Sequence, residues 1–548
     1  MNMRRTFKLL AAAAIIAATA ACSSMEKMAK MAENVKVTCE PEVLEVVNGS
    51  IDAIVKVTYP QGYFNPKAIL EVTPVIVYQG GEAAMKPFVY QGTKVKDNYK
   101  VVSSDGQTVT EHVHFDYVEG MEKCYLELRG VARAKSKSIT LPSKKVADGA
   151  NTTYMLVKRA GVVSFKPDNY QDVISSTAEG QIKYLVNSAE VRSSELKGQS
   201  VKDFQAALDK INADSRTTIT GTEIVAYASP EGPVNKNNEL SDKRSSSASK
   251  AWKEITKKHA AGNPDVKSIG EDWEGFQKLV RESNLEDKEL ILRVLSMYSD
   301  PAVRENEIRN MSQVFTALKG EVLPELRRAR LIANVEYQNY TSDELLKLLE
   351  DNADVLDEEA LLRTATLVKD DAQKEAIYNR AVSKFGSDRA RFNLAALYLG
   401  QEKVSKASEL LAKLDANDPD VLNAKGVIAL RQDELDAAET YFRRSANEDA
   451  KANLGIVELL TGRYDEAVKT LADAKGCCHN PALAYILTDQ LGKAAQTIHC
   501  SCPKCIYLKA IIAARQGDAD GVRKNLAETS AELREHALTD IEFAGYDL

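Results

Sequence analysis

The chain has 548 residues, of which 44% are hydrophobic and 28% are charged, and this length is sufficient for several globular domains. Its 72 basic and 79 acidic residues give a formal net charge of -7, and only 6% of the residues are aromatic. The mildly acidic balance argues against a nucleic-acid partner, and the few aromatic residues offer no evident stacking surface for bases.

The first 21 residues have the pattern of an export signal. The start MNMRRTFK is cationic, and the apolar run that follows is too short to cross a bilayer. Small residues precede Cys22, as in a bacterial lipoprotein signal, although Thr19 stands where such signals usually have Leu. We therefore predict a lipoprotein signal peptide at 1–21, a lipidated Cys22 and a linker at 22–34. Cleavage by ordinary signal peptidase is the alternative.

The residues after Cys22 bear on the location. The sequence SSMEKMAKMAE lacks the dense acidic run that resembles a surface-export signal in Bacteroidota lipoproteins. We therefore expect a lipid anchor on the periplasmic face of the outer membrane. No later run of the sequence is long and apolar enough for a transmembrane helix.

Residues 35–160 read as β structure. The runs IDAIVKVTY, AILEVTPVIVY and KCYLELRGVARA are rich in β-branched and aromatic residues and are separated by Gly, Pro, Asn and Asp. They predict a small all-β sandwich. Cys39 and Cys124 lie in strand-like runs, and they form either a disulfide or two buried thiols.

Residues 161–341 mix strands with helices. The runs IKYLVNSAEVR, TEIVAYA and RRARLIANVEYQ predict strands, whereas SVKDFQAALDKINA and LSDKRSSSASKAWKEITKK predict helices. Further helical runs between EDWEGFQKLVRES and the last strand predict a helical insertion. The block is therefore expected to be an α+β domain.

Residues 342–548 read as helical throughout and contain a repeat. A small residue recurs at intervals of 27 to 31 residues, at Ala376, Ala407, Ala438, Ala467, Ala494 and Val522. Small residues stand twelve positions earlier in several repeats, and large apolar residues stand four positions later. This spacing resembles the tetratricopeptide repeat and predicts an α-solenoid with a concave surface for another protein. An irregular helical bundle is the alternative.

The stretch VAYASPEGPVNKNNELSDKR, residues 225–244, resembles the OmpA-like peptidoglycan-associated domain. The residues on the family's positions are Gly232, Asn237, Leu240, Ser241 and Arg244. In that family an Arg and an Asp hold the diaminopimelate of the cell-wall peptide. The resemblance therefore implies that Arg244 grips a carboxylate near a helix N-terminus.

This sequence departs from the family at the acid. Ser229 stands in place of the Asp, and Glu231 is the nearest acid in the turn. The alternative places Arg244 on a solvated helix face, with Ser241 capping its own helix. The candidate peptidoglycan-binding residues are Tyr227, Ser229, Glu231, Asn237, Ser241 and Arg244.

A wider resemblance covers about residues 180–548. The segments YASPEG, GEDWEGF, LPELRRARL and DIEFAGY are similar to those of a Bacteroidota outer-membrane lipoprotein group. That group combines an OmpA-like domain with C-terminal tetratricopeptide repeats. The resemblance implies an accessory subunit of an outer-membrane assembly or secretion machine.

Five cysteines gather near the end of the chain, on what the repeat places as two neighbouring loops. They are Cys477, Cys478, Cys500, Cys502 and Cys505. They form disulfides between the loops, or four of them form a tetrahedral zinc site with His479 or His499 in reserve, or they stay free. A redox-active C-x-x-C is not expected, because its usual βαβ setting is missing.

The motifs of common enzymes are missing. The sequence has no Gly-rich phosphate loop, no H-E-x-x-H and no G-x-S-x-G. We therefore predict a non-catalytic scaffold without a cofactor, apart from the zinc alternative. Its expected partners are the outer membrane, peptidoglycan, and a β-barrel or other envelope protein. A simple tether to the cell wall and an enzyme acting on cell-wall peptides are the alternatives.

Overall fold

The computed structural model describes residues 24–474 and 476–548, which belong to two compact units. One unit joins Met1–Lys166 with Asp388–Leu548, and the other is Pro167–Ser387. The predicted signal peptide and Cys22 lie outside the described residues. None of the helices in the described ranges has the length and apolar character needed to cross a membrane.

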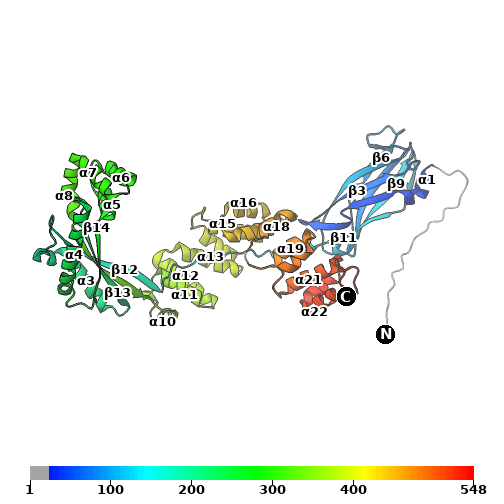
Figure 1. Ribbon diagram of the computed structural model, residues 1–548. Coiled ribbons are helices and arrows are strands. Elements are labelled where there is room, and N and C mark those ends of the chain that lie inside the picture. The colour runs from blue at the N-terminus through cyan, green and yellow to red at the C-terminus, as the bar shows by residue number, and fades with distance from the viewer. Residues whose placement is uncertain (1–23, 475) are drawn as a thin grey trace. The chain divides into compact units, whose positions relative to one another are not determined.

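The N-terminal region is all-β, as predicted (Figure 1). Its strands form one connected 11-stranded sheet, because the parallel pair β2–β11 joins two sets that are antiparallel except between β6 and β7. The strands are β1 (Lys36–Glu40), β2 (Val43–Val47), β3 (Ser50–Tyr59), β4 (Ile69–Tyr78), β5 (Gly81–Ala84), β6 (Phe88–Gly92), β7 (Lys100–Val102), β8 (Gln107–Asp116), β9 (Cys124–Ala134), β10 (Lys137–Thr140) and β11 (Lys144–Asn151).

The predicted linker at 22–34 is partly a helix. Helix α1 (Ser24–Lys30) is followed by the 3-10 turn η1 (Ala32–Asn34). Met25 and Met28 are buried, and Met28 belongs to the hydrophobic core of the β region. Their spacing of three residues places both on one face of the helix, which docks on the sheet.

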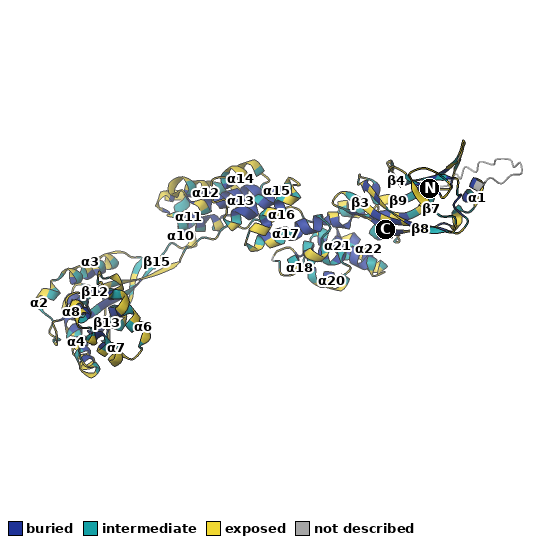
Figure 2. Cartoon of the chain, turned by 90° about the horizontal axis from the view of Figure 1, so that it is seen from above, coloured by how far each residue is buried: buried dark blue, intermediate teal, exposed yellow. Residues whose placement is uncertain are grey.

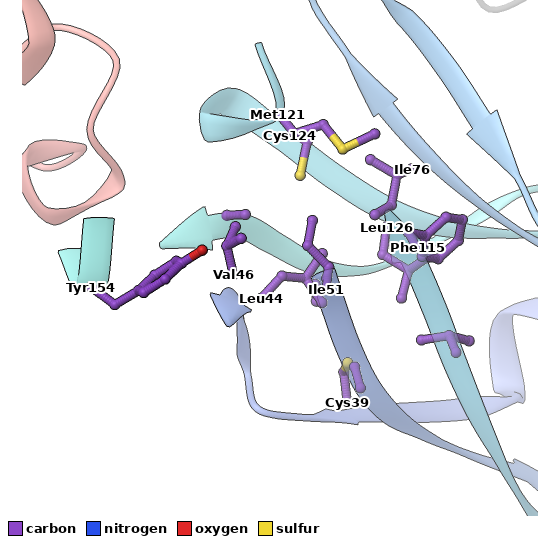
Figure 3. Close-up of a cluster of buried hydrophobic side chains, with 14 of the residues drawn as sticks. Cys39, Leu44, Val46, Ile51, Ile76, Phe115, Met121, Cys124, Leu126 and Tyr154 are labelled. Atoms are coloured by element: carbon purple, nitrogen blue, oxygen red, sulfur yellow. The ribbon is translucent and has the colours of Figure 1, made fainter. Parts of the chain in front are cut away.

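The bridge between Cys39 and Cys124 is not formed, and the alternative of two buried thiols holds. Cys39 on β1 is opposite Val55, whereas Cys124 on β9 is opposite Tyr78. The two side chains enter the same core from separate strands (Figure 3). Strand register therefore decides against this disulfide.

The two ends of the chain share one core, which the linear division into three domains did not predict. Buried residues of the β strands and of the last helices belong to one cluster. Glu542 accepts hydrogen bonds from Asn151 Nδ2 at 2.9 Å, Thr153 Oγ1 at 2.8 Å and Arg515 Nε at 3.0 Å. The 3-10 turn η5 (Ile541–Phe543), which contains Glu542, packs against both β11 and α21 (Pro503–Arg515).

The second unit contains the predicted α+β domain. Its sheet has the order β12 (Val173–Lys183), β15 (Arg328–Gln338), β13 (Thr217–Ala228) and β14 (Asp265–Glu271). Pairing is antiparallel except between β13 and β14. Helices α3 (Gln199–Ala213) and α4 (Val234–Ile255) pack on the sheet through Phe204 and Trp252.

Three details of this unit differ from the sequence prediction. Strand β14 was missed, because it is an exposed edge and lacks an apolar pattern. Residues 184–192 form a loop and the short helix α2 begins at Ser193, so β12 ends earlier than predicted. Helix α4 begins at Val234 rather than Leu240, because Pro233 is its N-cap and the Asn-rich stretch forms its first turns.

The predicted helical insertion lies between β14 and β15 and has its own hydrophobic core. It comprises α5 (Trp273–Glu282), α6 (Lys288–Met297), α7 (Pro301–Asn310), α8 (Ser312–Glu321) and α9 (Leu323–Leu326).

The C-terminal region is helical and built of helix pairs, as predicted. The first three helices, α10 (Ser342–Asn352), α11 (Glu358–Leu367) and α12 (Asp371–Phe385), belong to the second unit, so the boundary expected at 341/342 falls at 387/388. The rest are α13 (Asp388–Gly400), α14 (Val404–Leu411), α15 (Pro419–Arg431), α16 (Leu435–Arg444), α17 (Glu448–Leu460), α18 (Tyr464–Leu471), α19 (His479–Leu487), α20 (Leu491–Thr497), α21, α22 (Ala519–Glu528) and α23 (Ala531–Ala537).

The predicted pairing of small and large residues is confirmed in the middle repeats. A Cβ added to Gly426 would lie 2.4 Å from the Phe442 ring, and one on Gly455 would lie 2.4 Å from Leu471. The repeated small positions Ala407, Ala438, Ala467, Ala494 and Val522 are fully buried. Ala376 is exposed, so the alignment of the first repeat is wrong.

We predict that Gly455→Ala destabilises the first unit by about 1–3 kcal/mol, because the added methyl group collides with Leu471 in a packed core. Gly492→Ala is the matched control: it lies in helix α20 with nothing within 4 Å of the added carbon, and is expected to be neutral or slightly stabilising. Denaturant unfolding measures both. Equal stability of the two variants would contradict the close approach.

Candidate functional site

Arg244 is fully buried in helix α4 and does not present its guanidinium to a ligand. Its Nε, Nη1 and Nη2 donate to the carbonyls of Ser188, Tyr227 and Leu185 at 3.0, 2.9 and 3.2 Å. The guanidinium also lies over the ring of Tyr184, 5.1 Å from its centroid. Burial lowers the pKa of Arg244 to about 10, which keeps it charged at neutral pH. The loop at 184–192 therefore occupies the place that the resemblance assigned to a carboxylate.

The acid in the turn is also held internally. Glu231 forms an ion pair with Arg327 at 2.7 Å and accepts from Ser229 Oγ at 2.6 Å. Burial opposes ionisation of Glu231, but the hydrogen bonds from Arg327 and Ser229 outweigh it and lower the pKa of the carboxyl. The Glu231 carboxylate therefore pairs with Arg327 and is not free to bind the ammonium group of a ligand.

The remaining candidates of this turn serve the fold. Asn237 donates to Gly232 O at 2.8 Å and to Glu271 at 2.7 Å. The Ser241 hydroxyl lies 2.6 Å from that of Ser268 and 2.8 Å from Asn238 O. The prediction that these residues surround an anion-binding position is therefore wrong for this conformation. Ser241 is fully buried and does not cap α4, which begins seven residues earlier.

The helical repeats contain a different site, a groove that holds the chain's own segment 157–166 in the first unit. One asparagine on the first helix of each of four successive pairs contacts this segment. They are Asn393 on α13, Asn423 on α15, Asn453 on α17 and Asn480 on α19. Figure 2 shows α13 rich in buried residues. Asn393, Asn423 and Asn453 are almost completely enclosed.

These amides bind peptide groups, not side chains. Asn480 accepts from Lys158 N at 2.9 Å and donates to Lys158 O at 3.1 Å. Asn453 does the same at Val162, at 2.8 Å in both directions. Asn393 repeats the pattern at Lys166, at 2.7 and 3.0 Å. Each amide therefore pairs with one residue's N–H and C=O, as a neighbouring strand would.

Asn423 lies on the helix pair between those of Asn393 and Asn453 and makes a fourth contact with the segment. Its Nδ2 donates to Val162 O at 2.9 Å, and its Oδ1 accepts from Asn453 Nδ2 at 2.8 Å. A buried amide satisfied at both ends is held in one orientation, so these two asparagines fix each other.

The segment crosses four helix pairs in uneven steps. Four residues separate 158 from 162 and 162 from 166, but the first interval crosses one repeat, from Asn480 to Asn453, and the second crosses two, from Asn453 to Asn393. Eight residues of extended chain span at most about 26 Å, and three steps between packed helix pairs span about 24–30 Å. The segment also supplies Ala160 O, which accepts from Arg431 Nε at 2.9 Å, and Ser164 N, which donates to Asp449 at 2.7 Å.

Two residues of the segment fit the groove by their size or charge. Gly161 has a φ of +70°, and a Cβ there would lie 2.8 Å from Val427. Lys166 Nζ lies 2.7 Å from Asp418, 2.8 Å from Asp420 and over the ring of Phe392. The surface that the sequence assigned to another protein is thus occupied here by residues 157–166. The recurrence of Asn at intervals of 30, 30 and 27 residues within apolar helices was the available sequence signal.

The C-terminal cysteines gather beside one end of the same segment. Disulfides are not formed: all five thiols are free, with Cys478 and Cys505 buried. The sulfurs of Cys478, Cys500 and Cys505 lie within 4.8 Å of one another, so these residues can hold a metal ion. The Cys502 sulfur lies 3.5 Å from that of Cys500, and Lys158 Nζ lies 3.4 Å from Cys502 and 3.1 Å from Cys477.

The histidines of the two loops differ in their surroundings. His479 is buried, its Nε2 lies 2.8 Å from Leu156 O and its Nδ1 lies 3.8 Å from the Cys505 sulfur. Burial lowers the pKa of His479 to about 4, so the ring is neutral and Nε2 carries the donated proton. His499 is exposed and its Nδ1 lies 3.0 Å from Thr497 O.

Comparisons with known proteins add little to this picture. No protein-family model matches the chain, and no curated protein matches it. A tetratricopeptide repeat protein from Parabacteroides merdae ATCC 43184 is 15% identical, with a TM-score of 0.28, over 36% of this chain and 88% of that chain. A structure titled for the functional characterization of Pseudomonas aeruginosa pilF is 15% identical, with a TM-score of 0.28, over 37% of this chain and 97% of that chain. Both likenesses are too weak to carry an argument.

We predict that Arg244→Ala destabilises the second unit by at least about 3 kcal/mol, because three carbonyls lose a charged donor and a cavity is left in the core. Lys243→Ala, on the exposed neighbouring position, is expected to change stability by less than about 0.5 kcal/mol. Thermal unfolding separates the two. An Arg244→Ala protein as stable as the control would mean that the guanidinium is not built into the core.

We predict that Asn453→Ala loosens segment 157–166, because the Val162 N–H loses its acceptor and Val162 O keeps only one of its two amide donors. A loss of about 2 kcal/mol makes local opening about 30-fold more frequent, and trypsin cleavage after Lys158 and Arg159 should rise accordingly. Asn525→Ala is the control, since Asn525 bonds only to Gly521 O of its own helix. An unchanged cleavage rate in Asn453→Ala would show that the amides do not hold the segment.

Proposed function

We propose that this chain is a non-catalytic scaffold whose helical repeats bind extended peptide segments through the backbone. The observation that carries the proposal is the set of asparagines that pair with the N–H and C=O groups of Lys158, Val162 and Lys166. Contacts to peptide groups are largely independent of sequence, because every residue except proline offers the same donor and acceptor. In this structure the bound segment is the chain's own residues 157–166.

The proposed partner is an envelope protein, such as a β-barrel protein, that offers an extended segment to the same groove. The location rests on the cationic start, the short apolar run and Cys22, which would place the scaffold on the periplasmic face of the outer membrane. A role as an accessory subunit of an assembly or secretion machine is the corresponding cellular role. It is supported by the sequence resemblance described above.

Peptidoglycan binding through Arg244 is left out of the proposal. The guanidinium has no exposed surface and its donors meet carbonyls of the chain. A wall-binding role for the OmpA-like region would need opening of the loop at 184–192 and loss of these bonds.

The groove can be tested by vacating it. Gly161→Val with Val162→Pro should release the segment, because the first change collides with Val427 in a left-handed backbone and the second removes the N–H bonded to Asn453. A fluorescent peptide with the native sequence of residues 155–168 is then added to the full chain. We expect saturable binding to the released variant and none to the native chain, where a tethered competitor at about millimolar effective concentration fills the groove.

The control adds Asn453→Ala to the released variant, which should weaken peptide binding at least about tenfold. If trypsin shows that the segment is released but the peptide does not bind, the groove is a packing surface for its own linker and the proposed function fails. Binding that survives Asn453→Ala unchanged would contradict recognition by the asparagines.

A further inference from the structure

Three sulfur atoms of the C-terminal cysteine cluster, those of Cys478, Cys500 and Cys505, lie within 4.8 Å of one another, and a fourth, that of Cys502, lies beside Cys500. Cys478 and Cys505 sulfurs are 3.8 Å apart, and those of Cys500 and Cys502 are 3.5 Å apart. Cys500 lies within 4.8 Å of both Cys478 and Cys505, which links the two pairs. Cys478 directly precedes α19, Cys500 and Cys502 lie in the loop before α21, and Cys505 lies in the first turn of α21.

These separations agree with a tetrahedral metal site. Zinc–thiolate bonds are about 2.3 Å long, so the edges of a regular ZnS₄ tetrahedron are about 3.8 Å. A disulfide needs sulfurs about 2.05 Å apart, and the sulfurs of both pairs are well beyond that distance. The arrangement therefore favours a shared metal ion over bonds between sulfurs.

The backbone around the cluster supplies the donors that thiolates require. The backbone amides of His499 and Cys500 lie near the Cys478 sulfur, and the amides of Cys502 and Cys505 lie near the sulfurs of Cys500 and Cys502. N–H groups near a sulfur favour its thiolate form, which is the form that binds a metal.

A cation lies against the cluster as well. Four thiolates around Zn²⁺ carry a net charge of -2, and Lys158 Nζ is 3.4 Å from the Cys502 sulfur. Lys158 is also the residue whose peptide group is clamped by Asn480. The ammonium group therefore offsets the charge of the site and ties the segment to the two loops.

We propose that Cys478, Cys500, Cys502 and Cys505 bind one structural zinc ion that fastens the last helix pairs to each other and to segment 157–166. Four protein ligands leave no open position, so the ion has no catalytic role. Each thiol releases its proton on binding. The inference is independent of the peptide-binding proposal, because it rests on the cysteines and Lys158 and not on exchange of the segment for another peptide.

The full chain, purified under reducing conditions, is tested with zinc and with cobalt. We expect one zinc ion per chain by elemental analysis, and an intense thiolate-to-metal charge-transfer absorption when Co²⁺ replaces it. A zinc chelator should lower the unfolding temperature of the native chain, and added zinc should restore it. This measurement needs no variant, so it stands even where a ligand substitution prevents folding.

Single substitutions define the ligands. Cys478→Ser, Cys500→Ser, Cys502→Ser and Cys505→Ser should each lose stoichiometric zinc, whereas Cys477→Ser, on the exposed neighbouring cysteine, should keep it. Lys158→Ala should weaken zinc binding about 10- to 100-fold, as expected for a partner of a metal ligand.

Three outcomes would overturn the proposal. The first is a native chain that contains no zinc and gains no stability when zinc is added. The second is the finding, by mass spectrometry after alkylation, that the four cysteines form disulfides. The third is full zinc retention in Cys502→Ser, which would assign the fourth position to His479 and its Nδ1 instead. Retention in Cys477→Ser with loss in the other four supports the set as proposed.

Discussion

The pairing of asparagine amides with peptide groups is the interaction on which the first unit depends. A buried N–H or C=O without a partner costs about 1–3 kcal/mol, so a segment without secondary structure can lie in a helical groove only if side chains replace the missing strand. Asn393, Asn453 and Asn480 do this at Lys166, Val162 and Lys158. Because these three contacts are spread from Lys158 to Lys166, the segment is held along its length without any regular structure of its own.

The same requirement, that buried polar groups be satisfied, explains how the chain closes on itself elsewhere. Glu542 near the C-terminus is buried among Arg515, Asn151 and Thr153, which ties the last repeat to the end of the β region. Arg244 meets three carbonyls within its own unit. In both places a charged residue that the sequence alone would allow to bind a ligand instead joins segments that are far apart along the chain.

The bonding state of the cysteines also depends on tertiary structure. Their clustering on two loops was evident from the repeat spacing, but the choice between disulfides and a metal site depends on ångström-scale separations. Tertiary structure alone places the backbone amides of His499 and Cys500 near the Cys478 sulfur and Lys158 near Cys502. Lys158 connects this cluster to the groove, so the two features of the first unit are mechanically coupled.

The sequence by itself determined the element types and the helical repeat, because alternation, helical periodicity and recurring small residues are local patterns. Gly426 and Gly455 could be assigned to close helix contacts before any coordinates, since only a missing side chain allows that approach. Tertiary structure alone decided which polar groups face outward. Whether Arg244 or Asn453 meets a ligand or the chain's own backbone depends on the loop at 184–192 and on segment 157–166, which carry no periodic signal of their own. Contacts between such distant segments form because every buried polar group needs a hydrogen-bond partner, and a local sequence pattern does not show which distant segment supplies that partner.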